Sequence, residues 1–263
     1  MNSWEAALLG VLQGATEFLP VSSSGHLVIG QAILGLELPG VAFEVAVHVA
    51  TLLSVVVVYR DRLVGLAVGA AKREGAAWRY LGLLALATVP AAVAGVAFRS
   101  VVEGLFDSTW ITGVAFLVTG ALLWSARSAQ QRDDRKTAPG AKEAGLIGLA
   151  QAFALVPGIS RSGTTVVVAL WLGLEAREAA AFSFLMSIPA IAGAAVLQAP
   201  EILAGSAPVS GAPLVVGAGL AAIVGVVAIR AFVAVLANKS FHRFAYYMWG
   251  LGIAVLAAVV LTA

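Results

Sequence analysis

Two short stretches of the sequence gather the polar side chains that could do chemistry. The first, EFLPVSSSGH, covers residues 17–26 and contains a carboxylate, three hydroxyls and an imidazole. The second, PGISRSG, covers residues 157–163 and adds Arg161 between two serines. A serine beside a base is a candidate nucleophile, and a guanidinium is an always-charged donor fork that matches phosphate oxygens. Together the stretches predict an anion site that contains a nucleophile and a base.

The first stretch has the pattern of a helix, a break and a second helix. Gln13 and Glu17 are four residues apart and share one helix face, and Pro20 cannot continue that helix. Three serines then precede a new apolar segment, which is where N-caps are found. A helix N-terminus offers free N–H groups and a partial positive charge to a phosphate. His26, the candidate base, falls in the first turn of this second helix.

Simpler structural roles stay open for single members of this set. A serine before a helix is typically a cap, and Glu17 and Arg161 could form a purely structural buried ion pair. Ionisable side chains inside apolar segments are costly, however, so several of them together point to a functional site.

Four further ionisable residues could have either a structural role or a role in the site. Glu44 and His48 share one face of an apolar segment, where they either line the cavity or pair with each other. Arg230 lies near enough to a segment end to reach the cytoplasmic surface, and His242 is expected to be solvated in a basic loop. The sequence contains no HExxH, CxxC or Walker pattern, so neither a zinc site nor an ATPase has support.

The composition places these residues in a membrane. The chain has 263 residues, a mean hydropathy of +0.96 and only 11% charged residues, whereas soluble domains carry about 25%. We therefore expect a multi-pass membrane protein. A net charge of +2 gives no support for nucleic-acid binding, and the lack of cysteine excludes disulfides and thiol catalysis. The first residues have no basic segment before the apolar run, which argues against a cleaved signal peptide.

The lengths of the apolar segments separate full spans from shorter helices. A helical crossing needs about 20 apolar residues. Six segments are long enough, at roughly 41–59, 81–98, 110–127, 180–198, 213–236 and 244–262. Four others are too short to cross a core of about 30 Å, at roughly 4–18, 24–37, 143–156 and 163–174. Each short pair flanks a Pro/Gly/Ser break and is predicted to form a re-entrant hairpin.

The short pairs belong to an internal repeat. Gly10-Val-Leu-Gln13 recurs as Gly148-Leu-Ala-Gln151, and Ser22-Ser-Ser-Gly25 recurs as Ser160-Arg-Ser-Gly163, both at an offset of 138 residues. Each copy continues with three spans. We expect one integral membrane domain over 1–263, with repeats at about 1–128 and 143–263 joined by a cytoplasmic loop at 129–142.

The basic residues predict the orientation of the two halves. The loops at 60–80, 127–142 and 237–243 are rich in Lys and Arg, whereas 99–109 contains only Arg99 and 199–212 has no basic residue. The positive-inside rule puts the first three loops in the cytoplasm and both termini outside. The predicted fold is all-α and polytopic, with two inverted-topology repeats, each a re-entrant hairpin plus three transmembrane helices. The hairpin tips then meet near the midplane from opposite sides.

At these residues the sequence resembles the bacterial undecaprenyl-diphosphate phosphatase family, which is linked to bacitracin resistance. The resemblance covers nearly the whole chain, in LQGATEFLPVSSSGHL (12–27), FEVAVHVATLLSVVVVYRDRL (43–63), PGISRSG (157–163) and FSFLMSIPAIAGA (182–194). It implies a hydrolase of the bacterial plasma (inner) membrane that removes the terminal phosphate of undecaprenyl diphosphate. This reaction recycles the carrier for peptidoglycan and other wall polymers.

The family's motifs also imply roles for single residues. The implied catalytic residues are Glu17, Ser22, Ser23, His26 and Arg161, with either serine as nucleophile, and the implied substrate-binding residues are Gln13, Ser24, Gly25, Ser160, Ser162, Gly163 and Thr164. Some members have two glutamates in the paired-acid motif, which are proposed to hold a divalent cation such as Mg²⁺ or Ca²⁺. In this chain Glu17 would be the metal ligand, and Gln13 removes the second charge, which puts the metal in doubt.

Two other classes of protein compete with the phosphatase. A polyprenyl-phosphate transporter or flippase would use the same inverted repeats but needs no nucleophile beside a base. A lipid phosphatase of the phosphatidic-acid type 2 family would carry a second histidine after the arginine, but the only histidine after Arg161 is His242. The expected partners are the polyprenyl diphosphate lipid and the bilayer, without nucleic acid, and a homodimer is left open beside a monomer.

Overall fold

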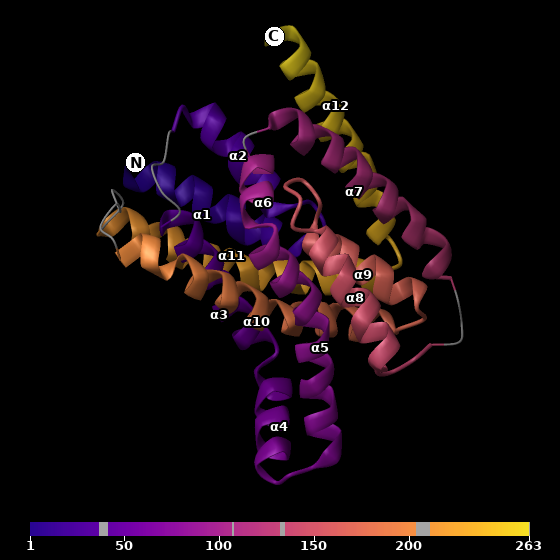
Figure 1. Cartoon of the computed structure of the whole chain (residues 1–263). Coiled ribbons are helices and arrows are strands. Elements are labelled where there is room, and N and C mark those ends of the chain that lie inside the picture. Colours follow the sequence, from indigo (N-terminus) through magenta and orange to yellow (C-terminus); the bar gives the residue numbers. More distant parts are fainter. Residues whose placement is uncertain (37–41, 107, 132–134, 204–210, 263) are drawn as a thin grey trace.

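The regular elements of the chain are helices throughout the described residues. The computed structural model describes residues 1–36, 42–106, 108–131, 135–203 and 211–262. An isolated backbone bridge joins Lys136 to Leu174 in these ranges. The predicted all-α fold is therefore confirmed for these ranges (Figure 1).

The four short helices form where the sequence predicts them. They are α1 (Ser3–Phe18), α2 (Ser23–Leu34), α8 (Ala141–Phe153) and α9 (Arg161–Trp171). Asn2 begins α1 through a reciprocal capping box with Glu5, which satisfies two backbone N–H groups. Ser160 caps α9 by accepting a hydrogen bond from the Gly163 N–H at 3.1 Å. At 11 to 16 residues, each helix is too short to cross a bilayer alone.

All six predicted spans are helices, which are α3 (Ala42–Val58), α5 (Gly75–Ala97), α7 (Thr109–Ala129), α10 (Ala176–Leu203), α11 (Ala212–Ala237) and α12 (Phe244–Thr262). By length and hydropathy, five of the helical stretches could cross a membrane. The sixth, α3, has only 17 residues and qualifies together with α4 (Arg60–Ala71), from which it is bent by 79°. The multi-pass membrane prediction is therefore confirmed.

Two loops predicted from the sequence are largely helical, which corrects that prediction. Residues 60–80 contain α4 and the start of α5, and residues 99–109 contain α6 (Arg99–Phe106). The hydropathy criterion finds apolar spans and misses such helices, because their sequences are not apolar enough to meet it. In α6 the Arg99 guanidinium bonds Glu103 one turn later at 2.6 Å. A third short helix, the 3₁₀ turn η1 (Phe241–Arg243), lies in the predicted loop at 237–243.

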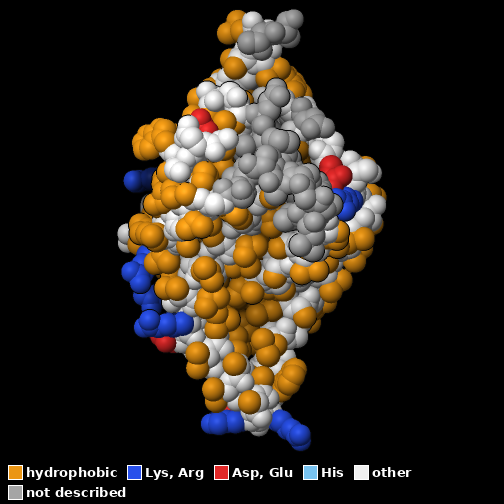
Figure 2. Space-filling model, turned by 90° about the vertical axis from the view of Figure 1, so that its left-hand side faces the viewer, with side chains coloured by type: hydrophobic (Ala, Val, Ile, Leu, Met, Phe, Trp, Pro, Cys, Tyr) orange, Lys and Arg blue, Asp and Glu red, His pale blue; other side chains and the backbone are white. Residues whose placement is uncertain are grey.

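A partly buried ion pair joins helix α4 to the body of the protein. Arg62 donates two hydrogen bonds to Glu178 of α10, at 2.7 and 2.8 Å, and its guanidinium lies 4.7 Å from the centre of the Tyr80 ring. Tyr80 of α5 donates to the same carboxylate at 2.9 Å. Figure 1 shows α4 and the first part of α5 projecting together from the other helices. In Figure 2 the lower end of the molecule, at this projection, carries Lys and Arg side chains below a largely hydrophobic face.

Small residues let the hairpin helices lie against long helices. Helix α1 packs along α11, and α8 packs along α5. A Cβ added to Gly10 would lie 2.2 Å from the Gly217 carbonyl oxygen, and one added to Gly148 would lie 2.5 Å from that of Ala87. Such close backbone approach is typical of helix packing in lipid.

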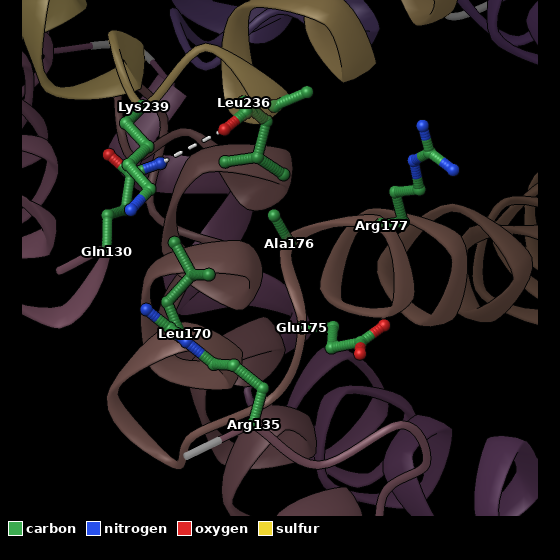
Figure 3. Close-up of a pocket in the computed structure, with 9 residues that line it drawn as sticks. Gln130, Arg135, Leu170, Glu175, Ala176, Arg177, Leu236 and Lys239 are labelled. Carbon is green, nitrogen blue, oxygen red and sulfur yellow. Dashed lines mark hydrogen bonds between the residues drawn. The ribbon is translucent and has the colours of Figure 1, made fainter. Parts of the chain in front are cut away.

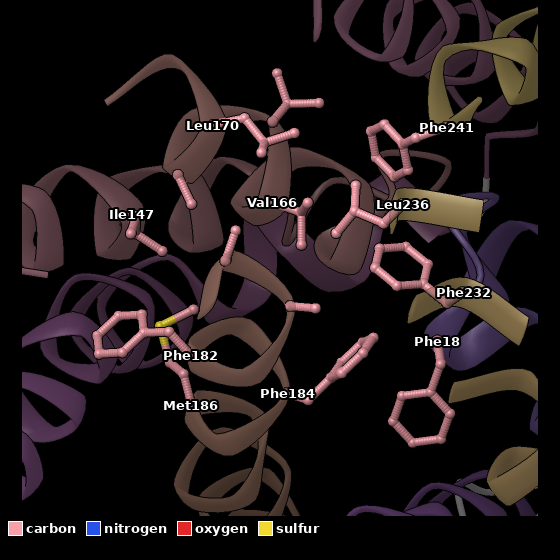
Figure 4. Close-up of a cluster of buried hydrophobic side chains, with 14 of the residues drawn as sticks. Phe18, Ile147, Val166, Leu170, Phe182, Phe184, Met186, Phe232, Leu236 and Phe241 are labelled. Atoms are coloured by element: carbon pink, nitrogen blue, oxygen red, sulfur yellow. The ribbon is translucent and has the colours of Figure 1, made fainter. Parts of the chain in front are cut away.

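The buried core lies between the second hairpin and the long helices. Its aromatic part, shown in Figure 4, runs from Phe18 through Phe184 and Phe232 to Phe241, with ring centroids 5.2 to 5.5 Å apart. The adjacent rings meet edge to face, which is a favourable geometry for aromatic pairs. Phe18 is the last residue of α1, so this packing fixes the end of α1 directly beside the first break.

Candidate active site

The two helix breaks meet inside the protein. Ser162 of α9 donates a hydrogen bond to the Leu19 carbonyl oxygen at 3.0 Å. A Cβ added to Gly163 would lie 3.2 Å from Cβ of Pro20, and one added to Gly25 would lie 3.3 Å from Cα of Gly158. The predicted contact between the tips is confirmed, and it brings the two polar stretches into one site.

Glu17 lies at the centre of this site and is only 7% exposed. Its Oε1 atom accepts a hydrogen bond from Arg161 Nη2 at 2.5 Å. Its Oε2 atom accepts from the Ser23 hydroxyl at 2.6 Å and from Gln13 Nε2 at 3.1 Å. The carboxylate thus joins a hydroxyl from α2 to a guanidinium from α9.

Donors and acceptors remain for a ligand beside this carboxylate. Arg161 Nη1 and Gln13 Oε1 are both buried and have no hydrogen-bond partner among the described residues. An unpaired buried polar atom costs about 1–3 kcal/mol, so such atoms are typical of a site that binds a polar molecule. One guanidinium nitrogen can therefore hold Glu17 while the other faces an anionic ligand.

The backbone is strained at the first break. Ser22 has φ of 68°, in the left-handed region that residues other than glycine rarely adopt. Its hydroxyl lies 3.3 Å from that of Ser24 and does not cap α2. Strain of this kind persists where the surroundings hold it, and it is concentrated at functional sites. The turn at Ser22 places Ser23, the first residue of α2, against Glu17.

The two ring nitrogens of His26 contact a backbone carbonyl and a tyrosine hydroxyl. Its Nδ1 atom is 2.7 Å from the Ser22 carbonyl oxygen, and its Nε2 atom is 2.7 Å from the hydroxyl of Tyr247. The candidate base predicted from the sequence is thus close to the break, but the group bonded to Ser23 is the Glu17 carboxylate. Tyr247 was not predicted as a site residue, because a tyrosine near the end of a span is usually assigned to the membrane interface.

The structure resolves the two interpretations of Glu44 and His48. His48 Nε2 lies 3.6 Å from Glu17 Oε2, and its Nδ1 atom is 2.7 Å from the Glu44 backbone carbonyl. The Glu44 carboxylate instead accepts from Gln31 of α2 at 2.9 Å. His48 therefore lines the site beside Glu17, and its side chain is 29% exposed.

The remaining predicted residues build the second tip or pack around the site. Ser160 caps α9, Ser162 holds the first break, and the buried Thr164 hydroxyl has no partner within the described part of the chain. Gly25 lies against the Phe116 ring, where a Cβ would come within 2.5 Å. Arg230 is exposed. The prediction of a solvated His242 is wrong, because its ring packs edge to face on Trp124 at 5.7 Å and its Nδ1 atom is buried.

The surroundings of the Glu17 carboxylate are unfavourable for a divalent cation. Its two oxygens already accept hydrogen bonds from a guanidinium, a hydroxyl and an amide N–H. A guanidinium this close repels a cation, and Gln13 contributes no charge. No group of three or more His, Asp or Glu side chains able to hold a metal occurs in the described ranges.

A separate pocket of about 340 Å³ lies elsewhere in the structure (Figure 3). It is lined by Gln130, Arg135, Leu170, Glu175, Ala176, Arg177, Leu236, Ala237 and Lys239, none of which is a predicted site residue. Charges of both signs line it, and Arg135 donates to the carbonyl oxygens of Ala129 and Leu174. These features do not indicate a particular ligand.

Comparisons with known proteins place the chain in a family. Residues 6–254 match the family described as bacitracin resistance protein BacA. The chain is similar to the undecaprenyl-diphosphatase of Carboxydothermus hydrogenoformans, with 40% identity over 262 residues and 97% of each chain covered. It is also similar to that of Rubrobacter xylanophilus, with 44% identity over 268 residues and 98% of each chain covered. The chain belongs to the bacitracin resistance protein BacA family.

Proposed function

We propose that this protein hydrolyses undecaprenyl diphosphate to undecaprenyl phosphate and inorganic phosphate in the bacterial plasma membrane. The observation that carries the proposal is the Ser23–Glu17 hydrogen bond of 2.6 Å beside the unpartnered Nη1 of Arg161. A nucleophile, its base and an anion-binding group are thus side by side. The names of the similar proteins supply the substrate, whose diphosphate would enter the site while its tail stays in lipid.

In the first step, the Ser23 hydroxyl oxygen attacks the terminal phosphorus while its proton moves to Glu17 Oε2. The bridging P–O bond breaks, and its electron pair leaves with undecaprenyl phosphate. Arg161 Nη1 and the N–H groups at the start of α2 and α9 hold the phosphate oxygens. They stabilise the charge that develops on these oxygens during transfer.

In the second step, water attacks the phosphorus of phosphoserine and the Ser23–phosphorus bond breaks. Glu17 returns its proton to the serine oxygen, and the proton of the water leaves with inorganic phosphate. We assign proton transfer to Glu17 in place of His26, since the carboxylate has the 2.6 Å contact and both imidazole nitrogens are engaged. The same contact favours Ser23 over Ser22, whose hydroxyl faces Ser24.

We also propose that the fold consists of two inverted repeats, at about 1–128 and 143–263, with both termini outside the cytoplasm. Corresponding contacts support this proposal. The first hairpin helix of each half packs on the second long span of the other half, α1 on α11 and α8 on α5. Gly10 and Gly148, which match at the repeat offset, both lie at these contacts, where an added Cβ would be 2.2 and 2.5 Å from a carbonyl oxygen of the facing helix. Whether two copies form a dimer stays a prediction.

Phosphate release by purified protein in detergent tests the proposed reaction. We expect release from undecaprenyl diphosphate without a sealed bilayer, which a transporter or flippase alone would not give. Arg161→Ala should lower kcat by about 10³-fold or more, because phosphoryl transfer depends on positioning and charge stabilisation. Arg230→Ala, at an exposed arginine of α11, is the matched control and should retain activity. Near-normal activity in Arg161→Ala would overturn the proposed site.

A further inference from the structure

His26 connects the last helix of the chain to the first break. Its ring is buried and stacks on the Tyr247 ring of α12, with centroids 5.7 Å apart and planes at 12°. Its Nε2 atom is 2.7 Å from the Tyr247 hydroxyl, and its Nδ1 atom is 2.7 Å from the Ser22 carbonyl oxygen. The backbone N–H of His26 donates to the same carbonyl at 3.2 Å.

These partners define the proton positions on the neutral ring. A carbonyl oxygen only accepts, so Nδ1 must carry the proton and donate to Ser22. The lone pair is then on Nε2, and the Tyr247 hydroxyl must donate to it. The Ser22 carbonyl therefore fixes the tautomer, and the Tyr247 hydroxyl anchors the opposite side of the ring. Without that hydroxyl, the ring loses one of its two anchors and can turn away from the Ser22 carbonyl.

The carbonyl that His26 holds belongs to the strained residue of the site. Ser22 has φ of 68°, and a non-glycine residue keeps such a conformation only where its neighbours fix it. The next residue is Ser23, whose hydroxyl must face both Glu17 and the incoming phosphorus. A small rotation at Ser22 would move that hydroxyl away from Glu17.

We propose that Tyr247 is a positioning residue for the reaction, acting through His26 and the Ser22 carbonyl to hold the Ser23 hydroxyl against Glu17. The proposal rests on the proposed phosphatase function. It gives His26 a positioning role and makes α12, the last helix of the chain, part of the active-site scaffold. A base role for His26 predicts the opposite effect, because freeing Nε2 from Tyr247 would then help the ring to accept a proton.

Tyr247→Phe is the direct test, because it removes the hydroxyl and keeps the ring stack. We expect kcat and the rate of phosphoserine formation to fall about tenfold, equivalent to one lost hydrogen bond, with KM within about twofold. Tyr246→Phe is the matched control and should keep wild-type kcat and KM. Tyr246 is 59% exposed, and its hydroxyl has no hydrogen bond within the described ranges. An unchanged or raised kcat in Tyr247→Phe would overturn the proposal, as would a rise in KM alone.

A second variant separates positioning from general damage to the fold. In His26→Asn, a shorter amide can still donate to Ser22 but presents nothing to Tyr247. Adding Tyr247→Phe to His26→Asn should therefore cost no further activity. A further tenfold loss in the double variant would show that Tyr247 acts without His26 and would contradict the proposal.

Nitrogen NMR of labelled histidine tests the contact independently of activity. The chain has three histidines, so His26→Asn identifies the His26 signals. In the full-length protein we expect the proton on Nδ1, and in Tyr247→Phe a shift of the Nε2 resonance that marks the loss of its accepted hydrogen bond. An unchanged Nε2 resonance would overturn the proposal. If wild-type protein released no phosphate while the NMR shift occurred, the proposed function would fail and the Tyr247–His26 contact would stand.

Discussion

The Glu17 carboxylate accepts the Ser23 hydroxyl at 2.6 Å across the break between α1 and α2. Its other oxygen binds Arg161 of the second hairpin at 2.5 Å. One carboxylate therefore orients the proposed nucleophile of one hairpin relative to the proposed phosphate-binding group of the other. The following predictions depend on this arrangement and on the packing that fixes it.

Glu17→Gln should lower kcat by about 10²- to 10⁴-fold, because an amide cannot take the Ser23 proton. The amide has nearly the same shape as the carboxylate, so the protein should still fold. Phosphate release measures the first effect, and the size-exclusion profile in detergent measures the second. A kcat within threefold of wild type would assign the proton transfer to another group.

Gln13→Glu should make activity sensitive to divalent cations. A second carboxylate four residues before Glu17 would face it, and Mg²⁺ binds readily through one or two carboxylates. We expect EDTA to change kcat in Gln13→Glu by a larger factor than in wild-type protein. The matched control is Gln31→Glu, on α2, beside Glu44. Equal loss of activity with EDTA in wild-type protein and Gln13→Glu would mean that Gln13 does not govern metal use.

Gly10→Ala should lower the free energy of unfolding of the protein in detergent by about 1–3 kcal/mol, and with it the melting temperature. The new Cβ would lie 2.2 Å from the Gly217 carbonyl oxygen, so α1 and α11 would have to separate. Gly219→Ala is the control on α11, since a Cβ there meets nothing within 4 Å. Thermal unfolding measures both variants, and a Gly10→Ala melting temperature equal to that of Gly219→Ala would contradict the packing described.

The sequence predicted helix positions well because length and hydropathy are local properties. Composition and repeat spacing predicted the break at Pro20 and the short hairpin helices. They also predicted the contact between the stretch around Glu17 and the stretch around Arg161. Helices α4 and α6 were not predicted, because their segments are not apolar enough to resemble spans and depend on contacts such as Arg62 with Glu178.

Details of the site required three-dimensional structure. Ser23 bonds Glu17 directly after the left-handed φ of Ser22, a conformation that a serine-rich stretch does not predict. His48 could be placed on a helix face, but its partner across the site could not be known. Tyr247 is 221 residues from His26, and no local pattern marks it.

Trapping the phosphorylated enzyme tests the central claim most directly. The protein would be mixed with undecaprenyl diphosphate labelled in its terminal phosphate, quenched in acid during turnover, and digested for peptide mass spectrometry. The account predicts labelled phosphate on Ser23, lost in Ser23→Ala together with phosphate release. Label on Ser22, or phosphate release by Ser23→Ala at a rate near that of wild type, would contradict it.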